Sequence, residues 1–153
     1  MSNLKGANFI ERPISKEEVF IPEEFTEEQL MIKAMVLEFC EKEIQEPLVK
    51  RGRELYATDD ADRLEIVKLL EKAAELGLCG VAIDEKYGGM NLDFNTGLIF
   101  SEAIAAGFSF ATTIGAQTSI GSLPIVYYGT EAQKEKYLPG VASGALKAAY
   151  ALT

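Results

Sequence analysis

The sequence of 153 residues contains no histidine. Imidazole is a common zinc ligand and the base of Ser-His and Cys-His catalysis, so its absence excludes those chemistries from this chain. Cysteine is nearly as scarce. Cys40 and Cys79 lie far apart without CxxC spacing, and we expect them to be buried, unpaired thiols. No pair of carboxylates stands out as an acid and base, so we assign neither a catalytic residue nor a metal ligand.

Basic residues are also few, with 15 Lys and Arg against 24 Asp and Glu and a net charge of -9. Nucleic acids and anionic membranes require clustered Lys and Arg, so neither is expected as a partner. Nowhere do eighteen apolar residues follow one another, and the N-terminus lacks the apolar stretch of a secretory signal. We therefore expect a cytoplasmic protein with no transmembrane segment.

The residue pattern predicts an all-α fold with five or six helices over residues 26–147. Residues 1–25 contain two prolines and show no sustained periodicity, which is typical of an extended arm. Apolar residues then recur at helical spacing between start and stop signals. The expected starts are capping boxes at Thr26 and Thr130 and caps at Asp60 or Asp62 and at Asp93; the expected ends are Pro47, Gly77, a break near Pro139, and the small residues 142–144.

Four glycines lie between the second and third expected helices: Gly77, Gly80, Gly88 and Gly89. Their spacing matches neither GxGxxG nor GxxxxGK[ST], the patterns that bind phosphate groups. We therefore expect tight turns between helices rather than a nucleotide site.

Residues 94–129 contain a single charged side chain, Glu102. A surface helix carries charges on its outer face, so we expect this region to be enclosed on most sides. Its small residues would let helices approach closely, whereas hydroxyl and amide groups such as those of Thr113, Gln117 and Thr118 are unusual in a purely apolar core. From the residues alone, two interpretations stay open: core packing, or the wall of a small-molecule site.

The chain ends in KAAYALT, where small, aromatic, aliphatic and β-branched residues follow a small-residue turn. This pattern predicts the opening of a β-strand at residues 149–153. Because a single strand needs partners to be stable, we expect the sequence to be a piece of a longer protein.

Three stretches resemble the N-terminal helical domain of the acyl-CoA dehydrogenases: YGG at residues 87–89, GTEAQKEKYLP at residues 129–139, and the final AYALT. The resemblance covers residues 26–153 and is strongest to the very-long-chain branch. One departure is Asp84, where the family usually has proline before the acidic residue matched by Glu85. The resemblance implies that residues 26–147 form an up-and-down helical bundle and that residues 148–153 begin an FAD-binding β-domain. A second helical domain would supply the catalytic glutamate.

The resemblance also implies an activity, the FAD-dependent α,β-dehydrogenation of fatty acyl-CoA to trans-2-enoyl-CoA. Electron-transfer flavoprotein would accept the electrons, and the full-length enzyme would be a homo-oligomer. This chain alone is expected to be inactive and not to hold FAD. An alternative is a stand-alone helical module that binds a protein partner or an acyl group without catalysis.

The same resemblance implies two groups of site residues. Cofactor contacts are expected from Tyr150, Leu152 and Thr153, and substrate contacts from Thr112, Gly115, Ala116 and Ser119. Thr112 and Ala116 fall where medium-chain relatives have larger polar side chains that close the floor of the acyl pocket. Smaller residues at these two positions favour long acyl chains.

Overall fold

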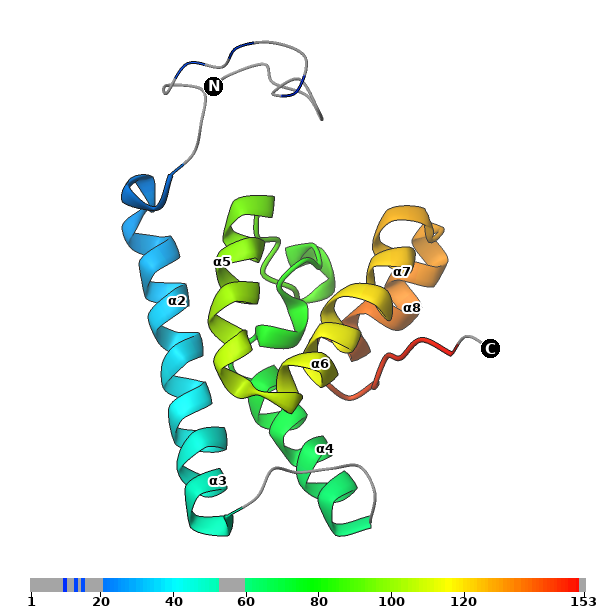
Figure 1. Cartoon of the computed structure of the whole chain (residues 1–153). Helices are drawn as coiled ribbons and strands as arrows, with labels where there is room; N and C mark the ends of the chain where they lie inside the picture. Colours follow the sequence, from blue (N-terminus) through cyan, green and yellow to red (C-terminus); the bar gives the residue numbers. More distant parts are fainter. Residues whose placement is uncertain (1–9, 11–12, 14, 16–20, 53–59, 152–153) are drawn as a thin grey trace.

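The computed structural model describes residues 10, 13, 15, 21–52 and 60–151, and within them every regular element is helical (Figure 1). The all-α prediction is confirmed. The α-helices are α2 (Glu27–Phe39), α3 (Glu46–Arg51), α4 (Asp60–Glu75), α5 (Phe94–Ile104), α6 (Ser109–Gly115), α7 (Leu123–Tyr128) and α8 (Glu131–Ala142). Two π-helical turns, η3 (Cys40–Gln45) and η7 (Ala116–Ile120), continue α2 and α6, and short 3-10 turns lie at Pro22–Glu24, Leu78–Gly80, Glu85–Tyr87 and Ala105–Gly107. Most of the predicted N-terminal arm lies outside the described residues.

The first helix is longer than predicted, because α2, η3 and α3 form one continuous rod along a side of the molecule (Figure 1). The expected end at Pro47 is wrong. Proline lacks the N–H of a regular helical bond, but the π turn before it is already wider, with the Glu46 N–H donating to the Glu41 carbonyl. The rod ends at Gly52, whose φ of 73° is the left-handed conformation that glycine adopts readily.

The last helix also passes through a proline. Pro139 lies inside α8, so the predicted break there is wrong. Leu138 and Val141 are buried on either side of it, and their packing offsets the hydrogen bond that proline cannot make. The predicted small-residue end is confirmed, with Gly144 at a φ of 71°.

Local capping is as the sequence predicts. Thr26 and Thr130 each open a capping box, in which the Thr hydroxyl accepts from the backbone N–H three residues on and the Gln there accepts from the Thr N–H. Gly77 ends the α4 region at a φ of 78°, also as predicted. The described part of α4 begins at Asp60, and Asp62 lies buried inside its first turn.

The predicted cap of α5, Asp93, connects two helices. Its carboxylate accepts from the backbone N–H groups of Asn95, at 2.9 Å, and Thr96, at 3.3 Å, and from the Thr96 hydroxyl. The same hydroxyl accepts from the amide of buried Gln29 at 3.0 Å. The hydroxyl of Thr96, followed by its backbone N–H, lowers the pKa of Asp93. The start of α2 is thereby joined to the start of α5.

Two apolar clusters form the core. The larger packs α2, α4, α5 and α6 around residues such as Val36, Ala73, Phe100 and Ile114, and the smaller contains Ile83, Tyr87, Leu138, Val141 and Ala142. The glycine-rich connection contributes to both clusters. Leu78, Cys79 and Val81 belong to the larger one, and Ile83 and Tyr87 belong to the smaller one.

The four glycines of this connection form turns and close contacts, as predicted. Gly77 and Gly88 have positive φ angles. Gly89 lies so close to the chain that a Cβ there would be 1.9 Å from the Ile83 carbonyl oxygen. The backbone hydrogen bonds from Met90 to Gly80 and from Leu92 to Val81 then close the connection on itself.

The enclosure predicted for residues 94–129 is found on one side only. The core-facing side of α5 is buried, but Phe94, Leu98 and Tyr128 are exposed by 80, 54 and 88%. The absence of charge therefore reflects an uncovered apolar face as well as a buried one. None of the helices described is both long and apolar enough to cross a membrane.

Gly89→Ala tests the close contact in the glycine-rich connection. We expect it to lower the free energy of unfolding by about 3 kcal/mol, because the added methyl group meets backbone that cannot move without breaking the connection. The matched control is Gly97→Ala in α5, where a Cβ meets nothing within 4 Å. That change should stabilise by about 0.5–1 kcal/mol through helix propensity. Urea unfolding measures both, and equal effects would contradict the contact.

Replacing Asp93 tests the cap of α5. We expect Asp93→Ala to lower the free energy of unfolding by about 1 kcal/mol at pH 7. Asp93→Asn should lower it by less, because Asn also caps helices. A lowered carboxyl pKa stabilises the fold above the unfolded-state pKa of about 3.9, and this contribution is lost as the pH falls through the folded-state pKa. The gap between the native chain and Asp93→Ala should therefore shrink below about pH 4 in urea titrations. An unchanged gap at pH 3 would contradict this role.

Candidate functional site

An apolar groove lies between α5 and the η7–α7 segment. It has a volume of about 370 Å³. Its walls include Phe94, Gly97 and Leu98 from α5 and Ser119, Leu123 and Tyr127 from the opposite side, and its base includes Val81, Ala82 and Leu92. A second hollow of about 410 Å³ adjoins it, shares Ser119, Leu123 and Tyr127, and continues over Pro124 and Tyr128. Together they form a long apolar surface open to solvent, which we call the α5–α7 groove.

The hydroxyl groups of one groove wall are bonded within their own helix. The Thr118 hydroxyl donates to the Ile114 carbonyl at 2.9 Å, and the Ser119 hydroxyl donates to the Gly115 carbonyl. Each hydroxyl therefore already donates its hydrogen bond to a carbonyl one turn earlier in the same helix, and it needs no hydrogen bond from a ligand. The wall is thus less polar towards a ligand than the residue types alone indicate.

The four predicted substrate residues follow one another along α6 and η7. Ser119 is exposed and lines the α5–α7 groove. Thr112 is exposed and Gly115 and Ala116 are half-buried, and these three are not among the groove's lining residues. Spacing of three and four residues places side chains on one face of a regular α-helix, but the π turn from Ala116 changes that angular spacing.

Gln117 is a buried polar residue whose role the sequence did not reveal. It is 1% exposed. Its Nε2 donates to the carbonyls of Val141, at 3.0 Å, and Leu146, at 2.9 Å, while its Oε1 accepts from the Ala148 N–H at 2.6 Å. A buried amide needs hydrogen-bond partners, so a single glutamine in an otherwise uncharged helix indicates that such partners exist. Its partners lie 24 to 31 residues away, so the sequence could not identify them.

The C-terminal segment carries the predicted cofactor residues. Tyr150 is 56% exposed, and Leu152 and Thr153 lie outside the described residues. The strand predicted to begin at Ala149 is not formed over residues 149–151. The physical reason is that no second strand is present among the described residues, and the chain just before, at Leu146 and Ala148, bonds instead to the side chain of Gln117. The exposed Tyr150 side chain is accessible to a flavin ring, so the described part of the segment fits a cofactor contact.

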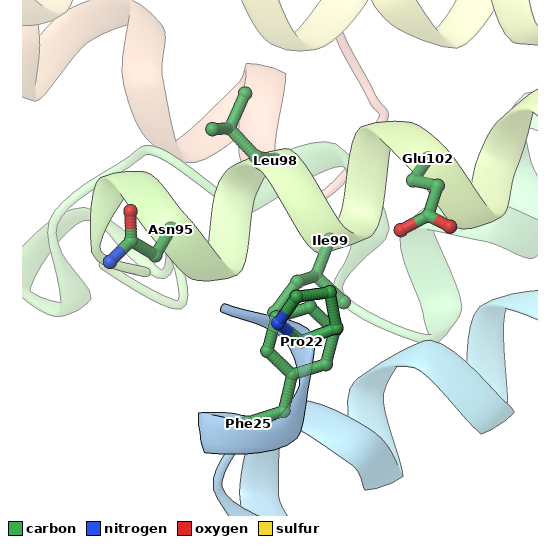
Figure 2. A pocket seen from close by; sticks show the side chains of 6 residues that line it. All are labelled: Pro22, Phe25, Asn95, Leu98, Ile99 and Glu102. Atoms are coloured by element: carbon green, nitrogen blue, oxygen red, sulfur yellow. The ribbon is translucent and has the colours of Figure 1, made fainter. Parts of the chain in front are cut away.

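A smaller pocket of about 210 Å³ lies on another side of α5 (Figure 2). Figure 2 shows Pro22 and Phe25 against Ile99, with the Asn95 amide at one end and the Glu102 carboxylate at the other. Glu102 pairs with Lys33 at 3.2 Å. This pocket contains none of the predicted site residues, so the α5–α7 groove is the better candidate.

The YGG turn is held by a polar cluster. The Tyr87 hydroxyl donates to the Glu131 carboxylate at 2.8 Å, and Lys86 reaches the same oxygen at 3.1 Å. The Tyr87 hydrogen bond, followed by that from Lys86, lowers the pKa of Glu131. These contacts attach the turn to the start of α8 and lie away from the α5–α7 groove residues, which indicates a structural role.

Other reactive groups are buried or dispersed. Cys40 and Cys79 are buried and unpaired as predicted, and burial raises the pKa of each thiol to about 11. Both are neutral thiols at pH 7 and poor nucleophiles. Among the described residues, no three His, Cys, Asp or Glu side chains form a group that could hold a metal ion.

Comparison with known proteins identifies one family. The family model described as "Acyl-CoA dehydrogenase, N-terminal domain" matches residues 26–145. A probable acyl-CoA dehydrogenase of Bacillus subtilis (strain 168) is 40% identical over 152 residues, which cover 97% of this chain and 24% of that protein. The mitochondrial very long-chain specific acyl-CoA dehydrogenase of Rattus norvegicus is 37% identical over 115 residues, 73% of this chain and 18% of that protein.

Solved structures give the same result. The crystal structure of an acyl-CoA dehydrogenase from Bacillus anthracis complexed with FAD superposes with a TM-score of 0.86 at 40% identity. The match covers 97% of this chain and 25% of that one. The chain thus spans about a quarter or less of the length of the relatives described.

We expect the α5–α7 groove to bind neutral apolar molecules. Tyr127→Ser should reduce the fluorescence of bound Nile red at least severalfold, because Tyr127 lines both hollows of the groove and not the pocket of Figure 2. The control is Met31→Ser on α2, because Met31 is 66% exposed and Tyr127 is 67% exposed. An equal reduction in the two variants would show that the dye reports general exposed apolar surface and would contradict a binding groove.

Proposed function

Because this chain belongs to the acyl-CoA dehydrogenase family, with the family's N-terminal domain at residues 26–145, we propose that it forms a helical wall of the acyl-CoA site in an FAD-dependent dehydrogenase. The enzyme would convert fatty acyl-CoA to trans-2-enoyl-CoA. Support comes from the 40% identity over almost the whole chain and from the α5–α7 groove.

The α5–α7 groove is the observation that carries the proposal. It is lined mainly by apolar side chains from two helices and is long and open, as a fatty acyl chain requires. Burial of each methylene of such a chain contributes about 0.8 kcal/mol, so a wall formed mainly by apolar side chains is suited to binding it. Glu102 is not among the lining residues; Asp93 is, but its carboxylate accepts hydrogen bonds from Asn95 and Thr96 as the cap of α5.

In this proposal the chain binds and orients, and it excludes water from the acyl chain. The FAD, when bound, would accept the hydride that leaves the β-carbon of the substrate. The residues of this chain proposed to hold it are Tyr150, Leu152 and Thr153, and residues 148–153 would begin the β-domain. The carboxylate base that removes the α-proton would come from outside the chain.

Long acyl chains are the proposed substrates. Thr112 and Ala116 have small side chains, and a Cβ added at neighbouring Gly115 would meet nothing within 4 Å. These three residues do not line the α5–α7 groove, so in this proposal they would lie beyond its end, where open space would admit the tail of a long acyl chain. Electron-transfer flavoprotein as the acceptor, homo-oligomeric assembly and a cytoplasmic location stay predictions from the family resemblance and the composition.

Ala116→Glu tests the chain-length proposal. In the purified flavoprotein that contains this domain, we expect the native sequence to favour palmitoyl-CoA over hexanoyl-CoA. The variant should lose at least about tenfold in kcat/KM for palmitoyl-CoA and retain the value for hexanoyl-CoA, because a carboxylate would block the end of the pocket and would be costly to bury beside an acyl chain.

The matched control is Ala61→Glu, the same substitution at an exposed position in the first turn of α4. It should leave both values unchanged. A native enzyme that turns over hexanoyl-CoA much faster than palmitoyl-CoA would contradict the long-chain proposal.

A further inference from the structure

We propose that Gln117 is a positioning residue that fixes the register of residues 146–151 and so determines how Tyr150 is presented to the flavin. The part that concerns the flavin rests on the proposed function. The part that concerns the segment rests on the hydrogen bonds and packing of this chain alone.

The Gln117 amide occupies the place of a neighbouring β-strand. Its Nε2 donates to the Leu146 carbonyl at 2.9 Å and its Oε1 accepts from the Ala148 N–H at 2.6 Å. A residue of a parallel strand makes the same pair of bonds, to a carbonyl and to the N–H two residues further along. One side chain thus replaces one rung of a sheet at the point where the segment leaves the helical domain.

A third hydrogen bond ties this rung to the preceding helix. The second N–H of the amide donates to the Val141 carbonyl, at 3.0 Å, near the end of α8. Gln117 therefore holds both sides of the turn between α8 and the C-terminal segment. At 1% exposure, water cannot replace these bonds without opening the structure.

Packing supports the same register. A Cβ at Gly121 would lie 2.7 Å from the Ala148 Cβ and 2.9 Å from the Ala148 carbonyl carbon. Ala148 therefore lies directly against Gly121, the residue that follows η7 and has no side chain. A larger residue would not fit opposite Gly121, so a shift that places Lys147 there is disfavoured. A shift the other way would place Ala149 there, which has the same side chain, so that direction is excluded by the hydrogen bonds of Gln117 and not by packing.

The register matters because side chains alternate along an extended segment. A shift of one residue reverses the face on which each side chain lies. Lys147 now bonds to Glu71 at 3.0 Å and to the Gly144 carbonyl at 2.7 Å, and a shift would break these contacts as well. Tyr150 is two residues beyond Ala148, so its direction follows from the bond that Ala148 makes.

The first experiment uses this 153-residue chain. Gln117→Met keeps the approximate size of the side chain but removes all three hydrogen bonds. We expect the amide of Ala148 to exchange with solvent at least about tenfold faster, measured by hydrogen exchange and NMR. The control is Gln29→Met, another buried glutamine, whose effect on Ala148 should not exceed its effect on other amides. Unchanged protection of Ala148 in Gln117→Met would overturn the proposal.

The second experiment uses the flavoprotein that contains this domain. Gln117→Met should raise the Kd for FAD about tenfold and shift the visible circular dichroism of the bound flavin, and Gln29→Met should change neither. Faster exchange of Ala148 with unaltered FAD binding would overturn the positioning role. A native protein that binds no FAD would contradict the proposed function instead, and the exchange result would still decide whether Gln117 anchors the segment.

If Gln117→Met does not fold, Gln117→Glu serves in its place. It retains an acceptor for the Ala148 N–H but sets a carboxylate against the Val141 and Leu146 carbonyls. We expect the Kd for FAD to rise in this variant also, and most at high pH, because burial and the two facing carbonyls favour the protonated carboxyl group, which can still donate one hydrogen bond. A Kd equal to that of the native protein from pH 7 to pH 9 would overturn the proposal.

Discussion

The close backbone contact in the glycine-rich connection is the constraint on which the rest of the structure depends. Gly89 packs directly on the Ile83 carbonyl, which no residue with a Cβ could do. This contact lets one short connection contribute Leu78 to the larger core cluster and Tyr87 to the smaller one. Val81 and Ala82, from the same connection, lie at the base of the α5–α7 groove. The contact between Gly89 and Ile83 therefore helps to set the position of the groove, although neither residue lines it.

A second theme is the use of uncharged helices for two purposes. The inner side of α5 joins the core through Ile99 and Phe100, while Phe94 and Leu98 on the outer side remain exposed. Exposed apolar surface of this extent marks a binding surface in most soluble proteins. Two of the relatives are about four times as long as this chain, and in the proposed enzyme the ligand and the rest of the protein would cover this surface.

Features set by neighbouring residues could be predicted from the sequence. The caps at Thr26, Asp93 and Thr130 were predicted because each depends on side chains three residues apart or fewer. Pro47 and Pro139 were misjudged because a π turn and core packing outweighed the local preference of proline. Of the four substrate residues that the family resemblance implies, only Ser119 lines the α5–α7 groove. The role of Gln117 was not predicted, because its three partners lie far along the chain.

The central claim is that this helical domain serves an acyl-CoA dehydrogenase with bound flavin. The most direct measurement is an anaerobic titration of the purified protein that carries this domain with palmitoyl-CoA, followed by the absorption of oxidised flavin. The account predicts that the absorption falls as substrate is added and that trans-2-hexadecenoyl-CoA is formed. A flavin whose absorption is unchanged by acyl-CoA of any chain length would contradict it.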